Sequence, residues 1–127
     1  MKLALKRGLP FTELTVVHQG KALALDRVLI DTGSAACVFS ADSLLEIGVA
    51  LDVGDSLRRV RGVGGAEFVF TKRLQTIRLG EAEVMDFEVE VGAMDYGLDL
   101  HAIVGVDLLM AAHMVIDLAR LELRVGG

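Results

Sequence analysis

The sequence predicts a mostly antiparallel β fold with one or two short helices. Runs of Val, Leu, Ile and Ala of strand length recur along the chain, and glycine or a polar turn separates each run from the next. Within the segment Glu81 to Val91, apolar residues alternate with acidic ones, which is typical of a strand with one buried and one solvated face. Only two segments favour a helix, and both are short. This succession of strands and turns, with no internal repeat or linker, indicates an antiparallel architecture.

The N-terminal part of the chain predicts a hairpin followed by a helix. Strands at Thr12 to His18 and Lys21 to Ile30 flank a two-residue turn. Ser40 is a favourable cap for a short peripheral helix over Ala41 to Ile47, and Gly48 suits the left-handed position that ends such a helix.

The remainder of the chain predicts three further hairpins and a second helix. The first hairpin pairs Ser56 to Arg61 with Ala66 to Thr71 across a glycine-rich tip, and the second pairs Arg73 to Leu79 with Glu81 to Val91 around Gly80. After a loop from Gly92 to Leu100, the expected elements are a strand at Ala102 to Val104, a helix at Asp107 to Ala112, and strands at Met114 to Leu118 and Leu121 to Val125.

Composition limits the class of protein. The 127 residues correspond to a single domain, residues 1 to 127, with one core. Apolar residues make up 53% of the chain and aromatic residues only 5%, so we expect an aliphatic core. The formal net charge of −5 argues against a nucleic-acid partner, because proteins that bind nucleic acid concentrate positive charge.

The cysteine and hydropathy patterns indicate a cytoplasmic protein. Cys37 is the only cysteine, so no internal disulfide can form, and its apolar neighbours indicate a small core residue rather than a nucleophile. The first residues resemble no signal peptide, and no run approaches the roughly 18 apolar residues of a membrane span.

Metal and cofactor chemistry is not expected. His18, His101 and His113 lack the spacing of metal ligands, and we expect them on the surface or in loops. No Gly-x-Ser-x-Gly sequence is present that would indicate a serine hydrolase.

The segment Val28 to Ser34 is the strongest functional signal. Three aliphatic residues lead directly into Asp31, and Thr32, Gly33 and Ser34 form a turn after it. A carboxylate at the end of a buried strand is a candidate for general acid–base chemistry. Alternatively, an isolated Asp-Thr-Gly can simply be a turn in which the aspartate caps its own backbone.

The glycine-rich tip Gly62-Val63-Gly64-Gly65 is the second signal. Taken alone, it can simply be a turn, because glycine readily adopts positive φ angles. It is not a dinucleotide-binding motif, because Glu67 stands where a glycine is required, and it has no P-loop lysine.

A third segment, Ile103 to Leu109, follows the first two signals along the chain. It reads as an apolar strand that breaks at Gly105 and continues into a helix. Taken with the segment around Asp31 and the glycine-rich tip, it resembles the retropepsin-like, single-domain aspartic proteases of the retroviral type. The resemblance covers about Thr12 to Val125, although the link between the Asp31 turn and the tip is longer than in the viral enzymes and the terminal strands do not obviously match.

The resemblance implies both a fold and a mechanism. The fold is a small closed antiparallel β-barrel of the acid-protease type, and the activity is peptide hydrolysis without a cofactor. That chemistry needs two neighbouring carboxylates that share one proton, and one chain supplies one, so the implied enzyme is a homodimer with Asp31 of each subunit on the two-fold axis.

The resemblance also assigns roles to the other motif residues. Thr32 hydrogen-bonds across the dimer, Gly33 presents its backbone to the carboxylates, and Ser34 hydrogen-bonds the outer carboxylate oxygen. Gly62, Val63, Gly64 and Gly65 form a flap that closes over a peptide or protein substrate. The alternatives are a non-catalytic dimerisation or peptide-binding module with the same fold, and a protease active only within a larger polypeptide.

Overall fold

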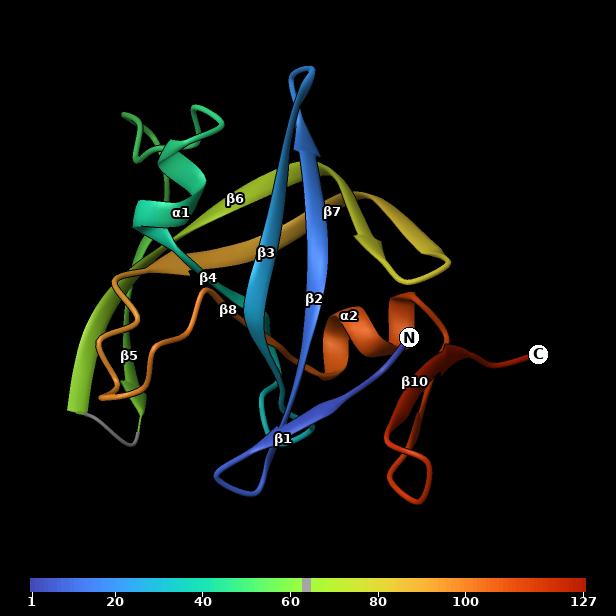
Figure 1. The fold of residues 1–127 in the computed structure, drawn as a ribbon. Helices are drawn as coiled ribbons and strands as arrows, with labels where there is room; N and C mark the ends of the chain where they lie inside the picture. Colours follow the sequence, from blue (N-terminus) through green and yellow to red (C-terminus); the bar gives the residue numbers. More distant parts are fainter. Residues whose placement is uncertain (63–64) are drawn as a thin grey trace.

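The computed structural model describes residues 1–62 and 65–127, which form a β-barrel with two short helices (Figure 1). Its elements in chain order are β1 (Ala4–Lys6), β2 (Leu9–His18), β3 (Lys21–Ile30), β4 (Val38–Ser40), α1 (Ala41–Leu45), β5 (Leu57–Gly62), β6 (Gly65–Leu79), β7 (Ala82–Gly92), β8 (Ala102–Val104), α2 (Val106–Ala111), β9 (Met114–Asp117) and β10 (Glu122–Val125).

The main sheet closes on itself. Its strand order is β1-β2-β3-β8-β4-β7-β6-β5, and an additional pairing of β2 with β6 closes the ring, leaving β1 and β5 outside it. This confirms the predicted small closed barrel. The barrel is mixed rather than wholly antiparallel, because β3 pairs with β8 and β4 pairs with β7 in parallel. Parallel neighbours must be joined by long connections, and hydrophobic patterns within single segments do not show them.

The long hairpins follow the predicted turns. β2 and β3 pair from Phe11 opposite Leu29 to His18 opposite Lys21, and β6 and β7 pair around Gly80. The two strands predicted between Ala66 and Leu79 are one continuous strand, β6. The polar residue between them, Lys72, does not interrupt it, because its backbone pairs opposite Val89 like its neighbours. Its ammonium group lies 2.8 Å from carboxylates of both Asp52 and Asp55.

Both predicted helices are present and cover the core. Ser40 caps α1 by accepting a hydrogen bond from the Ser43 N–H at 3.3 Å, and Gly48 has the expected positive φ of 78°. The prediction that α1 is peripheral is only partly right, since Leu44 on this helix is fully buried. α1 ends at Leu45, two residues before its predicted end, and α2 begins and ends one residue earlier than predicted.

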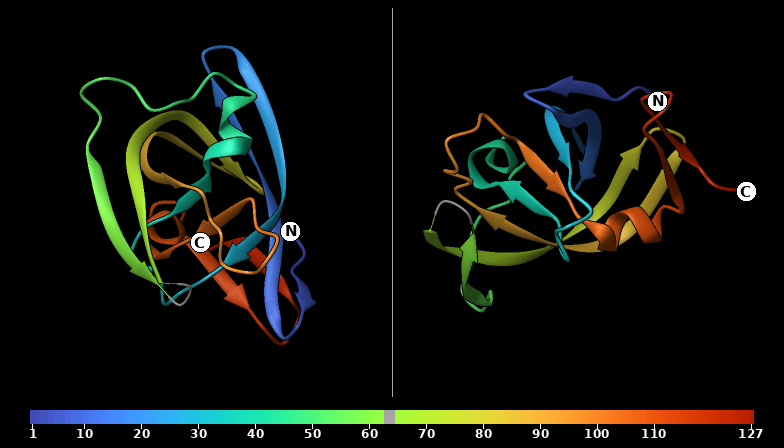
Figure 2. Two further views of the ribbon diagram at one scale, coloured as in Figure 1. Left: turned by 90° about the vertical axis from the view of Figure 1, so that its left-hand side faces the viewer. Right: turned by 90° about the horizontal axis from the view of Figure 1, so that it is seen from below.

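The two ends of the chain lie side by side (Figure 2). β9 and β10 form the predicted C-terminal hairpin, and the first three residues pair with its outer strand through two backbone hydrogen bonds of 2.8 Å, from Leu3 to Leu121 and from Leu123 to Met1. The sequence did not predict this pairing or the short strand β1.

The core is aliphatic, as the composition predicts. Its largest fully buried side chains are Phe39, Leu44, Leu74, Ile77, Leu79, Leu108, Leu123, Val16, Val28, Val69, Val89 and Val91. Neither helix in the described part of the chain has the length and apolar character needed to cross a membrane.

Candidate active site

Asp31 is held at the carboxyl end of β3 by its neighbours' backbone. Its N–H donates to the carbonyl oxygen of Val104 at 2.9 Å, which continues the parallel pairing of β3 with β8 by one residue. The Gly33 N–H donates to Asp31 Oδ1 at 2.9 Å, and the Ser34 N–H donates to the Asp31 carbonyl oxygen at 3.1 Å. The side chain is therefore fixed by a tight turn while the residue stays partly accessible to solvent.

Gly105 allows two chain segments to touch behind this turn. A Cβ at Gly105 would lie 2.6 Å from the carbonyl oxygen of Ser34 and 2.8 Å from that of Ala36. The next residue, Val106, donates its N–H to the same Ser34 oxygen at 2.8 Å. Any side chain at Gly105 would force the turn away from β8, so the close crossing predicted from the third motif is confirmed.

Cys37 lies buried beneath the turn and belongs to the core. Its thiol donates to Asp107 Oδ1 at 3.2 Å, and its sulfur accepts from the Gly105 N–H at 3.4 Å. Burial raises the pKa of this thiol strongly, and the neighbouring Asp107 carboxylate raises it further. A thiol that keeps its proton is a poor nucleophile, which agrees with the core role predicted for Cys37.

Asp107 received no role from the sequence. One of its oxygens accepts from the Leu108 N–H at 2.8 Å, and the other lies 3.4 Å from the Cys37 backbone nitrogen. It thus links the start of α2 to the chain that follows Asp31. An acidic residue in the first turn of a helix was the available signal, but its partner 70 residues away was not visible.

A shallow groove opens beside the turn. It has a volume of about 410 Å³ and is lined by Thr32, Gly33, Ser34, Ala35, Val106, Asp107 and Met110. Thr32 and Gly33 are exposed, and Met110 is 70% exposed. Within the described part of the chain no hydrogen bond joins the Ser34 hydroxyl to the Asp31 carboxylate, and the Ser34 backbone N–H donates to the main-chain carbonyl oxygen of Asp31. The role that the resemblance gives to the Ser34 hydroxyl stays a prediction.

The glycine-rich tip ends the β5–β6 hairpin. Its strands pair up to Gly62 opposite Gly65, while Val63 and Gly64 lie outside the described residues. β5 and β3 both run toward the lower edge of Figure 1, so the hairpin end and the Asp31 turn lie at the same end of the barrel.

Side-chain hydrogen bonds join this hairpin to the loop after β7. Glu67 on β6 accepts hydrogen bonds from the Tyr96 hydroxyl and, at 3.3 Å, from the Met94 N–H. Burial and the neighbouring Glu67 carboxylate raise the pKa of the Tyr96 hydroxyl. Sequence reasoning left residues 92–100 as a plain loop and missed this contact.

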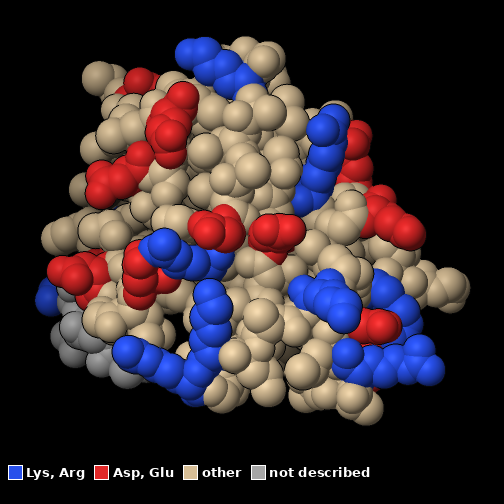
Figure 3. Space-filling view, in the orientation of Figure 1, with Lys and Arg blue, Asp and Glu red and all other residues tan. Residues whose placement is uncertain are grey.

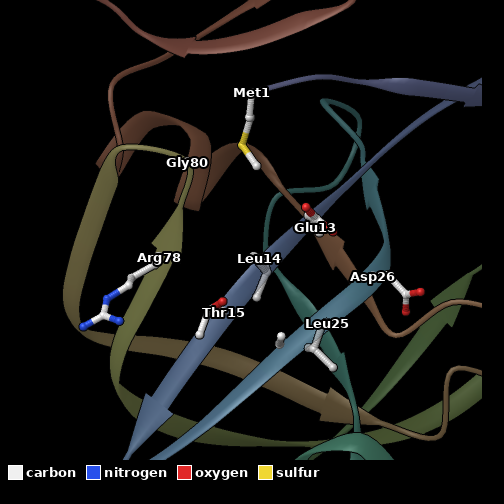
Figure 4. Close-up of a pocket in the computed structure, with 9 residues that line it drawn as sticks. Met1, Glu13, Leu14, Thr15, Leu25, Asp26, Arg78 and Gly80 are labelled. Atoms are coloured by element: carbon white, nitrogen blue, oxygen red, sulfur yellow. The ribbon is translucent and has the colours of Figure 1, made fainter.

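A larger cavity lies elsewhere. It measures about 640 Å³ and is lined by residues from β2, β3, the end of β6 and the β6–β7 turn, with Met1 at its edge (Figure 4). Its charged side chains, Glu13, Asp26 and Arg78, point in different directions, and Arg78 is bonded to Glu83 at 3.1 Å. This cavity shares no residue with the Asp31 groove and presents no converging set of polar groups.

The remaining polar residues include the three histidines and the charged residues of the surface. No cluster of three or more potential metal ligands occurs among the residues that the structure describes. His113 is exposed, and His18 and His101 are half-buried and hydrogen-bonded to neighbouring strands or loops. Lys and Arg side chains are interspersed with Asp and Glu on the face shown in Figure 3.

Comparison with known proteins agrees with this geometry. A crystal structure of a retropepsin-like aspartic protease from Rickettsia conorii superposes with a TM-score of 0.68 at 18% sequence identity, over 98% of this chain and 97% of that one. At this identity the match shows a shared fold. No curated protein sequence matches significantly. The sequence profile of the aspartyl protease family matches residues 14–108, a span that contains both the Asp31 turn and Gly105, and the chain therefore belongs to the aspartyl protease family.

Proposed function

We propose that the protein is an aspartic endopeptidase that works as a homodimer, with one Asp31 from each subunit forming the catalytic pair. The observation that carries this proposal is the Asp31 turn: a partly exposed carboxylate, fixed by the Gly33 N–H and by Val104, beside an open groove. The single Asp-Thr-Gly motif makes a second copy of the chain necessary, because the reaction uses two carboxylates.

The chemistry follows from two carboxylates that share one proton. The ionised carboxylate takes a proton from a water molecule as its oxygen attacks the peptide carbonyl carbon, and the protonated one donates its proton to the carbonyl oxygen. A tetrahedral diol results. When it collapses, one diol hydroxyl returns its proton to a carboxylate, the C–N bond breaks, and the other carboxylic acid protonates the leaving nitrogen. The pair ends with one proton, as it began.

The other residues of the turn and the hairpin have supporting roles. The exposed Thr32 is available to hydrogen-bond to the partner's turn and stiffen the pair. Gly33 holds the carboxylate oxygen through its N–H, and Ser34 closes the turn through its own N–H. Gly62, Val63, Gly64 and Gly65 act as a flap over the bound peptide, where glycine permits a close approach of the backbone. In this proposal residues 1–127 are one catalytic domain that acts in the cytoplasm.

The test is an Asp31→Asn substitution measured with mixed dimers. Asparagine has nearly the same shape but cannot act as acid or base, so the pure variant should lose all measurable cleavage of labelled casein while still dimerising. Equal amounts of wild type and variant are mixed and allowed to exchange subunits. Random pairing leaves about one dimer in four with both carboxylates, so activity should fall to about a quarter of that of wild type at the same total protein concentration.

Other outcomes would contradict specific parts of the proposal. Activity near half after demonstrated subunit exchange would mean that each chain works alone, and full activity of pure Asp31→Asn would refute the protease. A statine-type inhibitor, which mimics the diol, should raise the melting temperature of wild type. A wild-type protein that neither cleaves casein nor responds to the inhibitor would instead be the non-catalytic binding module.

A further inference from the structure

A second groove lies next to the Asp31 groove and is lined by a buried carboxylate that is incompletely hydrogen-bonded. The groove measures about 460 Å³ and is lined by residues of β5, β6 and β7 together with Ala36 and Asp107. Asp107 also lines the Asp31 groove, so the two hollows are neighbours. Ala36 belongs to the chain that leads away from the Asp31 turn. In the proposed function, a peptide bound at Asp31 therefore lies beside this second groove. The groove of each subunit then faces the peptide side chains on one side of the cleaved bond.

The carboxylate is that of Glu90 on β7. Its side chain is only 10% exposed, and Oε1 accepts from an Arg58 guanidinium nitrogen at 2.6 Å. Oε2 is fully buried and has no hydrogen-bond partner among the described residues. A carboxylate has about four acceptor positions, and a buried one that uses so few of them is costly. Glu90 is thus a strong acceptor with unused capacity.

The charge of the groove favours a cationic occupant. Glu88, Glu90 and Asp107 all line it, against one cation, Arg58. Asp107 is already occupied by Cys37 and the Leu108 N–H, which leaves Glu90 as the carboxylate with an unused buried oxygen. Lys and Arg side chains supply several N–H donors and a positive charge, which suit a carboxylate that still has unused acceptor positions.

Arg58 is placed to share Glu90 with an incoming cation. It lies on β5, the outermost strand of the flap hairpin, and its side chain is 62% exposed although its partner is buried. Because Oε1 is held by Arg58 and Oε2 is sealed from solvent, a substrate cation binds this carboxylate by displacing the Arg58 guanidinium from Oε1. Arg58 lies on the hairpin that closes over the peptide in the proposed function. The guanidinium group can therefore move away from Glu90 when the hairpin closes.

We infer that Glu90 is a specificity residue that selects peptides carrying a Lys or Arg side chain at a fixed position beside the cleaved bond, with Arg58 holding the carboxylate while no substrate is bound. The inference rests on the proposed function for the meaning of the cleaved bond. In a two-fold dimer the groove occurs twice, so equivalent positions on either side of the bond carry the preference.

The test uses a peptide library made by cutting a proteome after glutamate, which leaves internal Lys and Arg in the peptides. Wild type, Glu90→Gln and Glu83→Gln are incubated with the library, and the new ends are identified by mass spectrometry. Glu83 is the matched control, since it lies on the same strand, pairs with Arg78 and loses the same charge far from the groove. We expect wild type and Glu83→Gln to enrich Lys and Arg at equivalent positions on the two sides of the cleaved bond, and the enrichment to fall at least fivefold in Glu90→Gln.

A further variant separates selection from a merely structural ion pair. Arg58→Ala removes the competing cation, so the enrichment of Lys and Arg should rise above that of wild type. An ion pair that only holds β5 near β7 would lower the melting temperature in both variants and leave the enrichment unchanged. Arg58→Ala also keeps the inference testable if Glu90→Gln does not fold.

The result also distinguishes the two proposals from each other. Cleavage without basic enrichment, or with enrichment that Glu90→Gln does not alter, overturns the inference and leaves the protease standing. If wild type cleaves nothing, the protease proposal fails, and the same library is passed over immobilised wild type and Glu90→Gln. Retention of basic peptides that depends on Glu90 then supports the inference, whereas no retention, or retention independent of Glu90, overturns it.

Discussion

The Asp31 turn and the β5–β6 hairpin lie at the same end of the barrel, but they are built in opposite ways. The turn is enclosed by other segments: Val104 holds its backbone, Gly105 presses against it, and Cys37 is buried beneath it. The hairpin is attached through its own strand pairing and through polar contacts of Glu67 with Tyr96 and of Arg58 with Glu90, while its apolar side chains Leu57 and Phe68 are 58% and 63% exposed. One region is fixed by close packing, and the other buries less apolar surface.

The two regions therefore differ in whether a substitution can alter function without altering stability. In the turn, positions that orient the carboxylate are also positions that the core depends on, so most changes there affect folding. In the hairpin, few apolar side chains are buried, so substitutions should alter substrate handling without unfolding the barrel. The four predictions below test this contrast, from the largest expected effect to the smallest.

Gly105→Ala should destabilise the protein by about 3 kcal/mol, because the new methyl group overlaps two backbone oxygens that cannot move independently. Thermal unfolding should show a melting temperature lower by about 10 °C. Gly127→Ala is the control, since a Cβ there meets nothing within 4 Å. An unchanged melting temperature in Gly105→Ala would mean that the turn is not held by close packing.

Alkaline pH should weaken the folded state through Cys37. Burial raises the pKa of this thiol, so it stays protonated in the folded protein at a pH where the unfolded chain's thiol, with a pKa of about 8.5, ionises. The unfolded state then binds fewer protons, and the free energy of unfolding falls as pH rises above about 8.5, by about 1.4 kcal/mol per pH unit.

Cys37→Ala isolates this effect, because all other groups titrate equally in both proteins. Wild type should be the more stable protein at neutral pH, and its advantage should shrink by about 2 kcal/mol between about pH 7 and about pH 10. Urea unfolding at the two pH values measures the difference. A constant advantage across this range would show that the thiol can ionise in place.

At the hairpin tip, Gly64→Val and Gly65→Val should lower kcat/KM by about tenfold or more, because a β-branched side chain stiffens the backbone and blocks its approach to substrate. The free energy of unfolding should change by less than about 0.5 kcal/mol. Arg59→Val on the same hairpin is the control and should keep kcat/KM within about twofold. Normal cleavage by both glycine variants would mean that the tip is a simple turn with no role in substrate binding.

The smallest effect is expected at Phe68, where Phe68→Thr should change stability by less than about 0.5 kcal/mol because the ring is mostly exposed. Phe70→Thr, two residues along the same strand and only 9% exposed, should cost about 3 kcal/mol. Urea denaturation of both variants locates the point at which β6 leaves the core. Equal losses would mean that the hairpin is packed as firmly as the barrel.

Much of the fold could be predicted from local patterns. Alternation in β7, the turn at Gly80, the Ser40 cap and Gly48 each specify an element from neighbouring residues, and each element is found. The predicted solvated face of β7 is wrong at one residue: Glu90 is buried, because β4 and β6 flank this end of the strand. The parallel pairings of β3 with β8 and of β4 with β7 were not predicted. Each joins a three-residue strand to a long strand from a distant part of the chain, and the hydrophobic pattern of a three-residue strand does not identify its partner.

The candidate site divides in the same way. That Asp31 follows a strand and enters a tight turn could be predicted locally, because aliphatic residues followed by Thr-Gly-Ser specify strand and bend. The contacts around this end of the barrel, of Asp107 with Cys37, Arg58 with Glu90 and Tyr96 with Glu67, depend on the tertiary structure. These contacts join residues 29 to 70 positions apart, and they exist because barrel closure brings separate strands together and buries charges that then require partners.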